Sequence, residues 1–341
     1  MAVKAYPHRP ARRHALAALG ALALSGCASK TPSRPEAGPI AAMFLGEVDD
    51  GGFEEAGYRG LLRAGSELGI PVRHVAGVPA ERERMLAELR VLAASDATLV
   101  IGFGAAASEP IQRVAWEFPE QRFVAIQGTL TRPNLAVYAV LPEQSAWLAG
   151  ALAGLLTQTN VVGHLAGERS MLAQHVRAGL YAGLKSARPE ARLLSSFTGS
   201  DDDAPLARKL ALAQIDAGAD VVFTMLGVGQ GGATTACEER GVKQIGSVRD
   251  WVAVAPEAFL AAAVADPGYA IEMAARDLRD NLLKGDIIKR YGVHYPEAVR
   301  LALGAGVPAE TSARLERYRE RIAVGGIVIP TLYGGAEFAP G

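Results

Sequence analysis

The sequence predicts an α/β protein of two lobes, because one strand–turn–helix–strand unit occurs in each half of the chain. In the second half, an apolar run, a glycine-rich turn, a helix-length segment and another apolar run follow in order: 221–226, 227–232, 233–240 and 242–248. The stretch 96–128 has the same layout. Short β-branched runs bounded by glycine and separated by a helix pack as parallel neighbours. We therefore expect two sheets whose strand-end loops face each other across a cleft.

The first half alternates strands and helices from residue 40 onward. The helix at 53–68 is expected to end at Gly69, which suits a left-handed cap, and Pro71 prevents its continuation. The helix at 80–94 has apolar residues at helical spacing and charged residues on its other side. The predicted strands are 40–45, 72–75, 98–103, 123–126 and 135–140, and the third helix is 109–117.

The second half opens with an apolar segment, 142–157, whose length and polar start favour a buried helix over a membrane span. The acidic residues 201–203 precede a helix at 205–217, where the helix dipole favours negative charge. The other predicted elements are strands 161–165, 192–197 and 299–303, helices 171–187, 269–283 and 309–324, and a final apolar run at 327–330. With three passages between the lobes, we expect lobe 1 to hold 40–141 plus about 290–330, and lobe 2 to hold 142–289.

The N-terminus has the features of an export signal. Basic residues from Lys4 to Arg13 precede an apolar run, Ala15 to Leu24, that is too short to span a bilayer. The run ends in Leu24-Ser25-Gly26-Cys27, which resembles a bacterial lipobox with Cys27 as the lipidated residue. We therefore expect a lipoprotein signal peptide at 1–27 and a proline-rich, polar tether at 28–39. The pair Arg12-Arg13 leaves both the Sec and the twin-arginine route open.

Composition and motifs argue against several classes of protein. The net charge is −1 and the basic residues are scattered, so no nucleic-acid surface is predicted. The chain lacks an H-E-x-x-H motif, a paired-cysteine zinc spacing and a G-x-S-x-G elbow. If Cys27 is lipidated, Cys237 is the remaining thiol, and its place in a predicted helix suits a small buried residue. We therefore expect no metal, no cofactor and no catalytic residues.

The glycine turn allows three interpretations. Gly227, Gly229 and Gly232 form G-x-G-x-x-G between a strand and a helix, and Asp250 follows at about the twenty-residue offset of a dinucleotide-binding fingerprint. Glycines also suit a loop that approaches another ligand closely, or a tight structural turn. An NAD-dependent oxidoreductase therefore stays open as an alternative function.

Several segments together resemble the basic-membrane-protein family of bacterial lipoproteins. They are DDGGFEEAGYRGL, TLVIGFGAAASEPIQRVAWEFPEQRFVAIQG, NVVGHLAGERSMLAQHVRAGLYAGL, DAGADVVFTMLGVGQGG, GVKQIGSVRDW and RERIAVGGIVIP. The resemblance implies a type I periplasmic-binding-protein fold, in which two Rossmann-like lobes with parallel sheets are joined by a three-crossover hinge. It also implies a receptor that binds a nucleoside or purine and delivers it to the permease and ATPase subunits of an ABC importer. We expect this receptor to be a monomer that faces the periplasm and is lipid-anchored to the cell membrane or the outer membrane. A ligand-sensing surface lipoprotein without a transporter is a further alternative.

The resemblance also places ligand-binding residues. The family's first ligand loop falls on Asp50 to Glu54, where Phe53 is expected either to stack on a base or to pack in the core. Its Gly-Phe turn falls on Gly102 and Phe103, its glycine-rich loop on 227–232, and its ribose-binding aspartate on Asp250, which could instead cap the next segment.

Four positions depart from the family pattern. Glu54 stands where the family has asparagine, and Val248 stands where it has an acid. The lysine expected on the next helix falls on Ala265, and Trp251 replaces a polar residue and could add a stacking surface. A site with fewer hydrogen-bonding groups and more aromatic area should favour a flat base or another heteroaromatic compound over a full nucleoside.

Overall fold

The computed structural model describes residues 38–339 of the chain. The predicted signal peptide, Cys27 and nearly all of the tether lie outside the described residues, so these remain predictions. The elements up to the first crossover are β1 (Ile40–Met43), α1 (Phe53–Leu68), β2 (Val72–Val75), α2 (Arg82–Ala93), β3 (Leu99–Phe103), a 3-10 turn η1 (Ala105–Ala107), α3 (Ser108–Glu117), β4 (Phe123–Ile126) and β5 (Leu135–Val140).

The remaining elements continue the alternation of strands and helices. They are α4 (Pro142–Leu156), β6 (Val161–Ala166), α5 (Met171–Ala187), β7 (Arg192–Phe197), α6 (Ala204–Asp216), β8 (Val221–Met225), α7 (Gln230–Arg240), β9 (Lys243–Val248), α8 (Trp251–Val254), β10 (Phe259–Ala265), α9 (Pro267–Arg279), β11 (Ile288–Tyr291), β12 (Val299–Leu303) and α10 (Ala309–Ala323).

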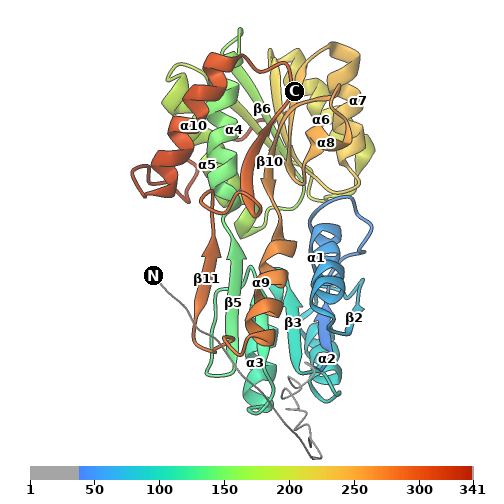
Figure 1. Cartoon of the computed structure of the whole chain (residues 1–341). Helices are drawn as coiled ribbons and strands as arrows, with labels where there is room; N and C mark the ends of the chain where they lie inside the picture. Colours follow the sequence, from blue (N-terminus) through green and yellow to red (C-terminus); the bar gives the residue numbers. More distant parts are fainter. Residues whose placement is uncertain (1–37, 340–341) are drawn as a thin grey trace, which may run out of the picture. The chain divides into compact units, whose positions relative to one another are not determined.

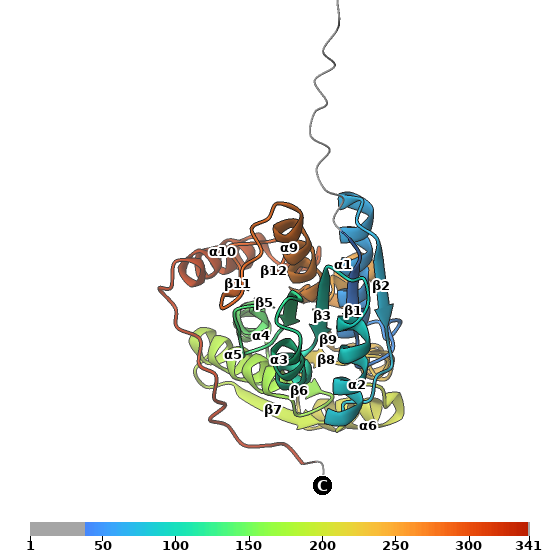
Figure 2. The same ribbon diagram turned by 90° about the horizontal axis from the view of Figure 1, so that it is seen from below.

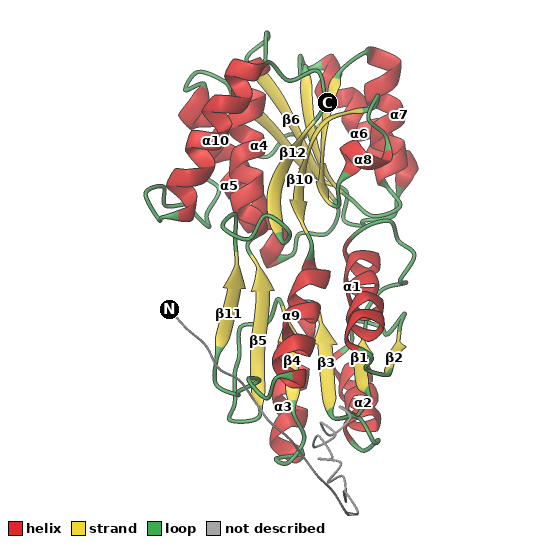
Figure 3. Cartoon of the chain, viewed as in Figure 1, coloured by secondary structure: helices red, strands yellow, loops and turns green. Residues whose placement is uncertain are grey.

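The first lobe is a six-stranded parallel sheet in the order β11-β5-β4-β3-β1-β2, and Figure 1 labels β11, β5, β3 and β2 in this order. Its inner strands β5, β4, β3 and β1 are buried on both faces, as parallel sheets require. One face packs on α1 and α9, and the other packs on α2 and α3, which is clear when the lobe is seen from below (Figure 2). The carboxyl ends of these strands point toward the second lobe, where ligand sites of open α/β sheets form (Figure 3).

The second lobe is a six-stranded sheet in the order β12-β10-β9-β8-β6-β7, in which β12 alone among its strands runs antiparallel to its neighbour. Helices α4 and α5 cover one face, and α6 and α7 cover the other. The backbones of α4 and α5 lie very close together, since a Cβ atom on Gly150 would be 1.9 Å from the Leu180 carbonyl oxygen. The predicted buried helix is thus confirmed, and no helix in the described part of the chain is long and apolar enough to cross a membrane.

The late elements belong to other lobes than the sequence led us to expect. β10, an alanine-rich strand that was not predicted, completes the second sheet beside β9. The chain then returns to the first lobe, where α9 packs on α1 and β11 pairs with β5. β12 pairs with β10, and α10 packs on α4 in the second lobe. The boundaries at 142–289 and about 290–330 are therefore wrong, although the three crossovers are present, after β5, β10 and β11.

The C-terminal segment lies along the edge of the second sheet. The predicted run 327–330 forms no strand, but the Phe338 amide donates to the Ser195 carbonyl oxygen of β7 at 2.7 Å. Glu337 accepts two hydrogen bonds from Arg169, at 2.7 and 3.1 Å, and it is also paired with Arg177. The side chain of Arg177 is 6% exposed, so the segment supplies the counter-charge of a buried cation.

Candidate functional site

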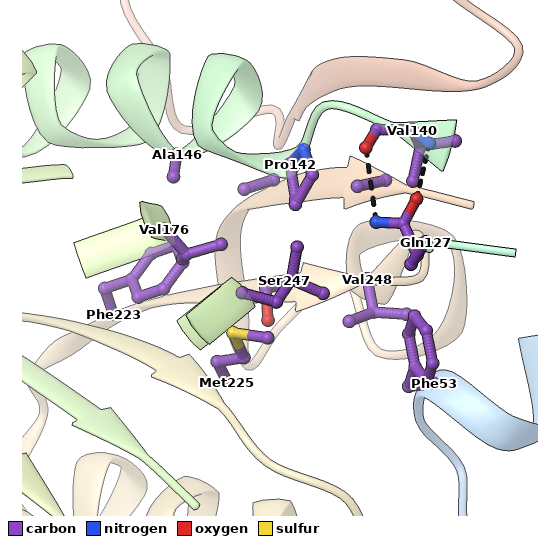
Figure 4. A pocket seen from close by; sticks show the side chains of 13 residues that line it. Phe53, Gln127, Val140, Pro142, Ala146, Val176, Phe223, Met225, Ser247 and Val248 are labelled. Atoms are coloured by element: carbon purple, nitrogen blue, oxygen red, sulfur yellow. Dashed lines mark hydrogen bonds between the residues drawn. The ribbon is translucent and has the colours of Figure 1, made fainter. Parts of the chain in front are cut away.

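An apolar cavity lies between the lobes, at the carboxyl ends of the strands (Figure 4). The first lobe contributes Phe53, Gln127 and Val140 to its wall, and Pro142, at the start of the crossover, also lines it. The second lobe contributes Ala146, Leu172, Val176, Phe223, Met225, Ser247, Val248, Ala263 and Ala265. The volume open to a water-sized molecule is about 20 Å³, which is far below the range of about 300–1,000 Å³ for ligand pockets. A ligand larger than a water molecule would therefore enter this space only when the lobes move apart.

None of the residues that line the apolar cavity is ionisable. The amide of Gln127 is already used, because its oxygen accepts from the Val140 amide at 2.7 Å and its nitrogen donates to the Val140 carbonyl at 3.2 Å. Ser247 is the other polar lining residue, and its hydroxyl makes no hydrogen bond within residues 38–339. A ligand here would meet aromatic and aliphatic surface with few hydrogen-bonding partners.

Phe53 is the predicted ligand residue that faces the apolar cavity. It is the first residue of α1, and its ring lies 4.6 Å from the ring of Phe103, centroid to centroid. Phe103 is fully buried and packs in turn on Phe44 at 4.9 Å. Phe103 therefore supports Phe53 from behind. Gly102 also lies away from the cavity, because a Cβ atom there would be 3.0 Å from Ile111 of α3.

Asp50 holds the loop before α1 in place. Its carboxylate accepts from the backbone amides of Gly52, Glu54 and Glu55, at 2.8, 3.3 and 3.0 Å, and so caps the helix. Carboxylates are favoured in this position because they satisfy free amides at the positive end of the helix. Asp50 thereby fixes the direction in which Phe53 enters the cavity.

Glu54 turns away from the apolar cavity toward the loop at Leu45 and Gly46. Burial raises the pKa of its carboxyl to about 8, and the charge of Asp50 adds to the rise, while backbone hydrogen bonds from Gly46 and Leu45 act in the opposite direction. Its Oε2 is buried without a hydrogen-bond partner in the described chain. Glu54 is thus a neutral side chain at neutral pH.

The glycine turn is held by the loop at 201–202. The amides of Gly227 and Gly229 both donate to the Asp201 carbonyl at 3.0 Å, and the Val228 amide donates to the Asp202 carboxylate at 3.1 Å. These groups are the ones that a phosphate would need. The amides of the turn are therefore used within the chain and are not free to bind the pyrophosphate of a dinucleotide.

Gly232 has a packing role. A Cβ atom there would lie 1.9 Å from the Ala204 carbonyl oxygen, so glycine allows α7 to pack closely on the start of α6. Neither Gly229 nor Gly232 lines the apolar cavity.

Asp250 and Trp251 face two other spaces between the lobes. Asp250 caps α8 through the Ala253 amide at 3.1 Å and accepts from Arg300 at 2.9 Å. It lines a groove, here called the charged groove, with Gly51, Gly52, Glu55, Ala56, Arg59, Arg63, Val248, Arg249, Ala253, Val254, Val264, Asp266, Glu297 and Arg300. Trp251 stacks on Phe259 at 5.1 Å and lines a second groove, here called the Trp251 groove, with Asp50 and Gly227.

The lobes touch at the mouth of the cleft. Arg249 donates to the Gly51 carbonyl oxygen at 3.3 Å, which joins the second lobe to the first ligand loop. Beside it, a Cβ atom on Gly52 would be 3.3 Å from the Gly227 Cα. Five of the ten predicted site residues thus line three spaces in one cleft: Phe53 lines the apolar cavity, Asp250 the charged groove, and Asp50, Gly227 and Trp251 the Trp251 groove.

Sequence reasoning missed most of the cavity lining. Val140, Met225 and Ala265 are the last residues of β5, β8 and β10, and Gln127 follows β4 directly. Their position at strand ends was the available signal, since ligands of open α/β sheets bind there. The resemblance had implied that Ala265 lies on a helix, but it is the last residue of the strand β10.

Comparisons with known proteins agree with this architecture. Residues 38–331 match the family model described as ABC transporter substrate-binding protein PnrA-like. A CD4+ T-cell-stimulating antigen of Listeria monocytogenes is 24% identical over 306 residues, which cover 84% of this chain and 85% of that protein. Basic membrane protein D of Borreliella burgdorferi is 25% identical over 249 residues, or 71% of this chain and 72% of that protein.

A solved structure shows the same fold. The ABC transporter system solute-binding protein from Conexibacter woesei superimposes with a TM-score of 0.70 at 25% identity, covering 86% of this chain and 98% of that one. The family and the fold are those of solute-binding proteins and not of enzymes. The resemblance to basic membrane proteins and the expected periplasmic-binding-protein fold are confirmed.

Proposed function

Because the chain belongs to the PnrA-like family of ABC transporter substrate-binding proteins, we propose that it is a receptor for a small, uncharged, flat heteroaromatic compound such as a purine base. The observation that carries the proposal is the lining of the apolar cavity, which combines Phe53 with aliphatic side chains and holds no ionisable group. A flat ring buries a large polarizable face against an aromatic side chain and needs few hydrogen bonds.

Two of the four departures from the family pattern support a base over a nucleoside. Val248 and Ala265 occupy the positions that the resemblance assigns to an acid and a lysine, and both line the apolar cavity. Vicinal ribose hydroxyls bind well to a carboxylate, which can accept from both. Asp250 does not supply one here, because it lines the charged groove and pairs with Arg300.

Closure of the lobes is the mechanism that fits this cavity. Both lobes contribute to its wall, so a bound ligand contacts both and favours the closed arrangement by the difference in its affinity for the two states. The permease of an ABC importer would then receive the closed, loaded form. Lipidation at Cys27 would keep the receptor at the membrane, on the periplasmic side.

Thermal-shift and calorimetric measurements with free bases, nucleosides, riboflavin and NAD test the ligand class. A ligand at a hundred times its Kd should stabilise the protein by about 2.7 kcal/mol, which raises Tm by several degrees. We expect a shift with free bases that is lost in Phe53→Ala. Tighter binding of uridine or inosine than of any free base would refute the proposed ligand class, and a response to NAD alone would refute the receptor itself.

The lipid anchor has a separate test. In a bacterial host, the wild-type chain should fractionate with the membrane and the variant Cys27→Ser should be released in soluble form. Mass spectrometry of the mature N-terminus should find an acylated Cys27. An unmodified N-terminus elsewhere would contradict the anchor without affecting the ligand proposal.

A further inference from the structure

Two residues of the apolar cavity have a backbone conformation that their side chains disfavour. Gln127 and Val248 have φ values of +60° and +69°. The other non-glycine residues with positive φ in the described chain are Asn160, Asn281 and Asp286, which are types that tolerate this region. A β-branched residue is a strong outlier there, because its Cβ substituents crowd the backbone. Such conformations persist where the surrounding structure imposes them, and they gather at binding sites.

Val248 stands at the boundary between two spaces. It lines the apolar cavity and it also lines the charged groove. The register of the sheet explains why it is unusual for one strand residue to line both spaces. Val248 is opposite Val264, and Ser247 is opposite Ala263, in the parallel pair β9 and β10. Side chains alternate along a strand, so Ser247 and Ala263 face the cavity while Val264 faces the groove.

The positive φ of Val248 changes the direction of its side chain. In a regular strand Val248 would face the groove with Val264. The strained backbone at the end of β9 instead lets the isopropyl group border both spaces, and Figure 4 shows it beside the ring of Phe53. The isopropyl group therefore separates an apolar space from one that contains arginine and carboxylate groups.

We propose that Val248 is a specificity-determining residue, whose isopropyl group closes the apolar cavity toward the charged groove and so excludes ligands with a polar substituent on that side. The inference rests on the proposed function, since it assumes that the ring of the ligand lies in the apolar cavity. The charged groove is then the space into which a sugar or another polar substituent would extend once the side chain at position 248 is removed.

Binding measurements with matched ligand pairs test the exclusion. Calorimetry on the mature chain would compare hypoxanthine with inosine, and adenine with adenosine, in the wild type, Val248→Ala and Val248→Gly. We expect the wild type to prefer each free base and both variants to raise the relative affinity of the nucleosides by about tenfold or more, as for removal of a steric clash in an apolar pocket. Val91→Ala, on the exposed surface of α2, is the control and should leave the ratios unchanged.

Melting temperatures test the strain without any ligand. At position 248 the glycine variant should melt at a higher temperature than the alanine variant, because glycine accepts positive φ and alanine does not. At Val264, an ordinary strand position, the order should be reversed. The same order at both positions would overturn the argument from strain.

The outcomes separate the inference from the proposed function. If the wild type binds free bases but the base-to-nucleoside ratio is the same in Val248→Gly, Val248 does not determine specificity and the receptor function stands. If the wild type binds inosine as tightly as hypoxanthine, the exclusion itself is refuted. If no base or nucleoside binds any of the three proteins, the proposed ligand class fails, and the melting temperatures still decide whether position 248 is strained.

Discussion

Replacing Phe53 with leucine should weaken ligand binding with a limited effect on folding. Leucine keeps aliphatic contact with Phe103, whose ring is 4.6 Å from that of Phe53, but it removes the aromatic face from the cavity. The lost ring pair should lower the free energy of unfolding by about 0.5–1.5 kcal/mol. Because stacking of an aromatic side chain on a base contributes about 1–3 kcal/mol, the Kd should rise by roughly 5- to 150-fold.

The matched control is Phe259→Leu. Phe259 also packs on an aromatic ring, that of Trp251 at 5.1 Å, and it is buried where Phe53 is half-buried, but it lines the Trp251 groove and not the apolar cavity. Its replacement should reduce stability by a similar amount and leave the Kd unchanged. Isothermal titration calorimetry with the best free base, at 25 °C, measures both variants. If Phe259→Leu weakens binding and Phe53→Leu does not, the ligand binds beside Trp251, and the assignment of the apolar cavity is refuted.

Three further predictions concern stability. Glu337→Gln should lower the free energy of unfolding by about 1–2 kcal/mol at pH 7, because it leaves the buried Arg177 without its counter-charge; this value is reduced for the exposure of Glu337 itself. The arginine partners lower the pKa of Glu337 to about 2, so the difference in stability between variant and wild type should disappear as the pH falls from about 4.5 through 2. Urea denaturation measures this difference, and a constant value across the pH range would contradict the ion pair. Glu54→Gln should stabilise the protein at pH 9, by up to about 5 kcal/mol, and have little effect near pH 4.5. A carboxyl whose pKa is raised to about 8 destabilises the fold as the pH rises from its ordinary value through 8; equal pH profiles would argue that Glu54 is solvated. Gly232→Ala should lower the free energy of unfolding by about 1–3 kcal/mol, because its methyl group clashes with Ala204. Gly231→Ala has open space around it and should stabilise the helix by up to about 1 kcal/mol. Similar Tm values for the two variants would contradict the close contact of α6 and α7.

The order of helices and strands could be predicted because each depends on local patterns. Glycine at position 69, with φ of +65°, ends α1 where the sequence indicated, and the strands of the first unit are continuous apolar runs. β10 was missed because four of its seven residues are alanine, which has little strand preference. Its position in the sheet is fixed by pairing with β9 and β12, and no local sequence pattern indicates this pairing.

The candidate site could be predicted only in outline. The resemblance located Phe53 and the departures at Val248 and Ala265, and all three line the apolar cavity. It could not show that Asp50 is a helix cap or that Asp250 pairs with Arg300, because a carboxylate suits a cap, an ion pair or a sugar equally well. The glycine motif was ambiguous for the same reason, since glycine permits a ligand, a turn or a close helix contact.

The sequence by itself determined the class of this protein, through local periodicity, turn residues and the combined motifs that identify its family. The tertiary structure decided which lobe each late element joins, since strand pairing brings β11 to β5 and β12 to β10 across long separations in the chain. It also decided the chemistry of the cleft. Backbone directions at the ends of the strands select which side chains meet, and at Val248 a φ of +69° turns a strand residue toward the cavity, which no pattern of residue types could show.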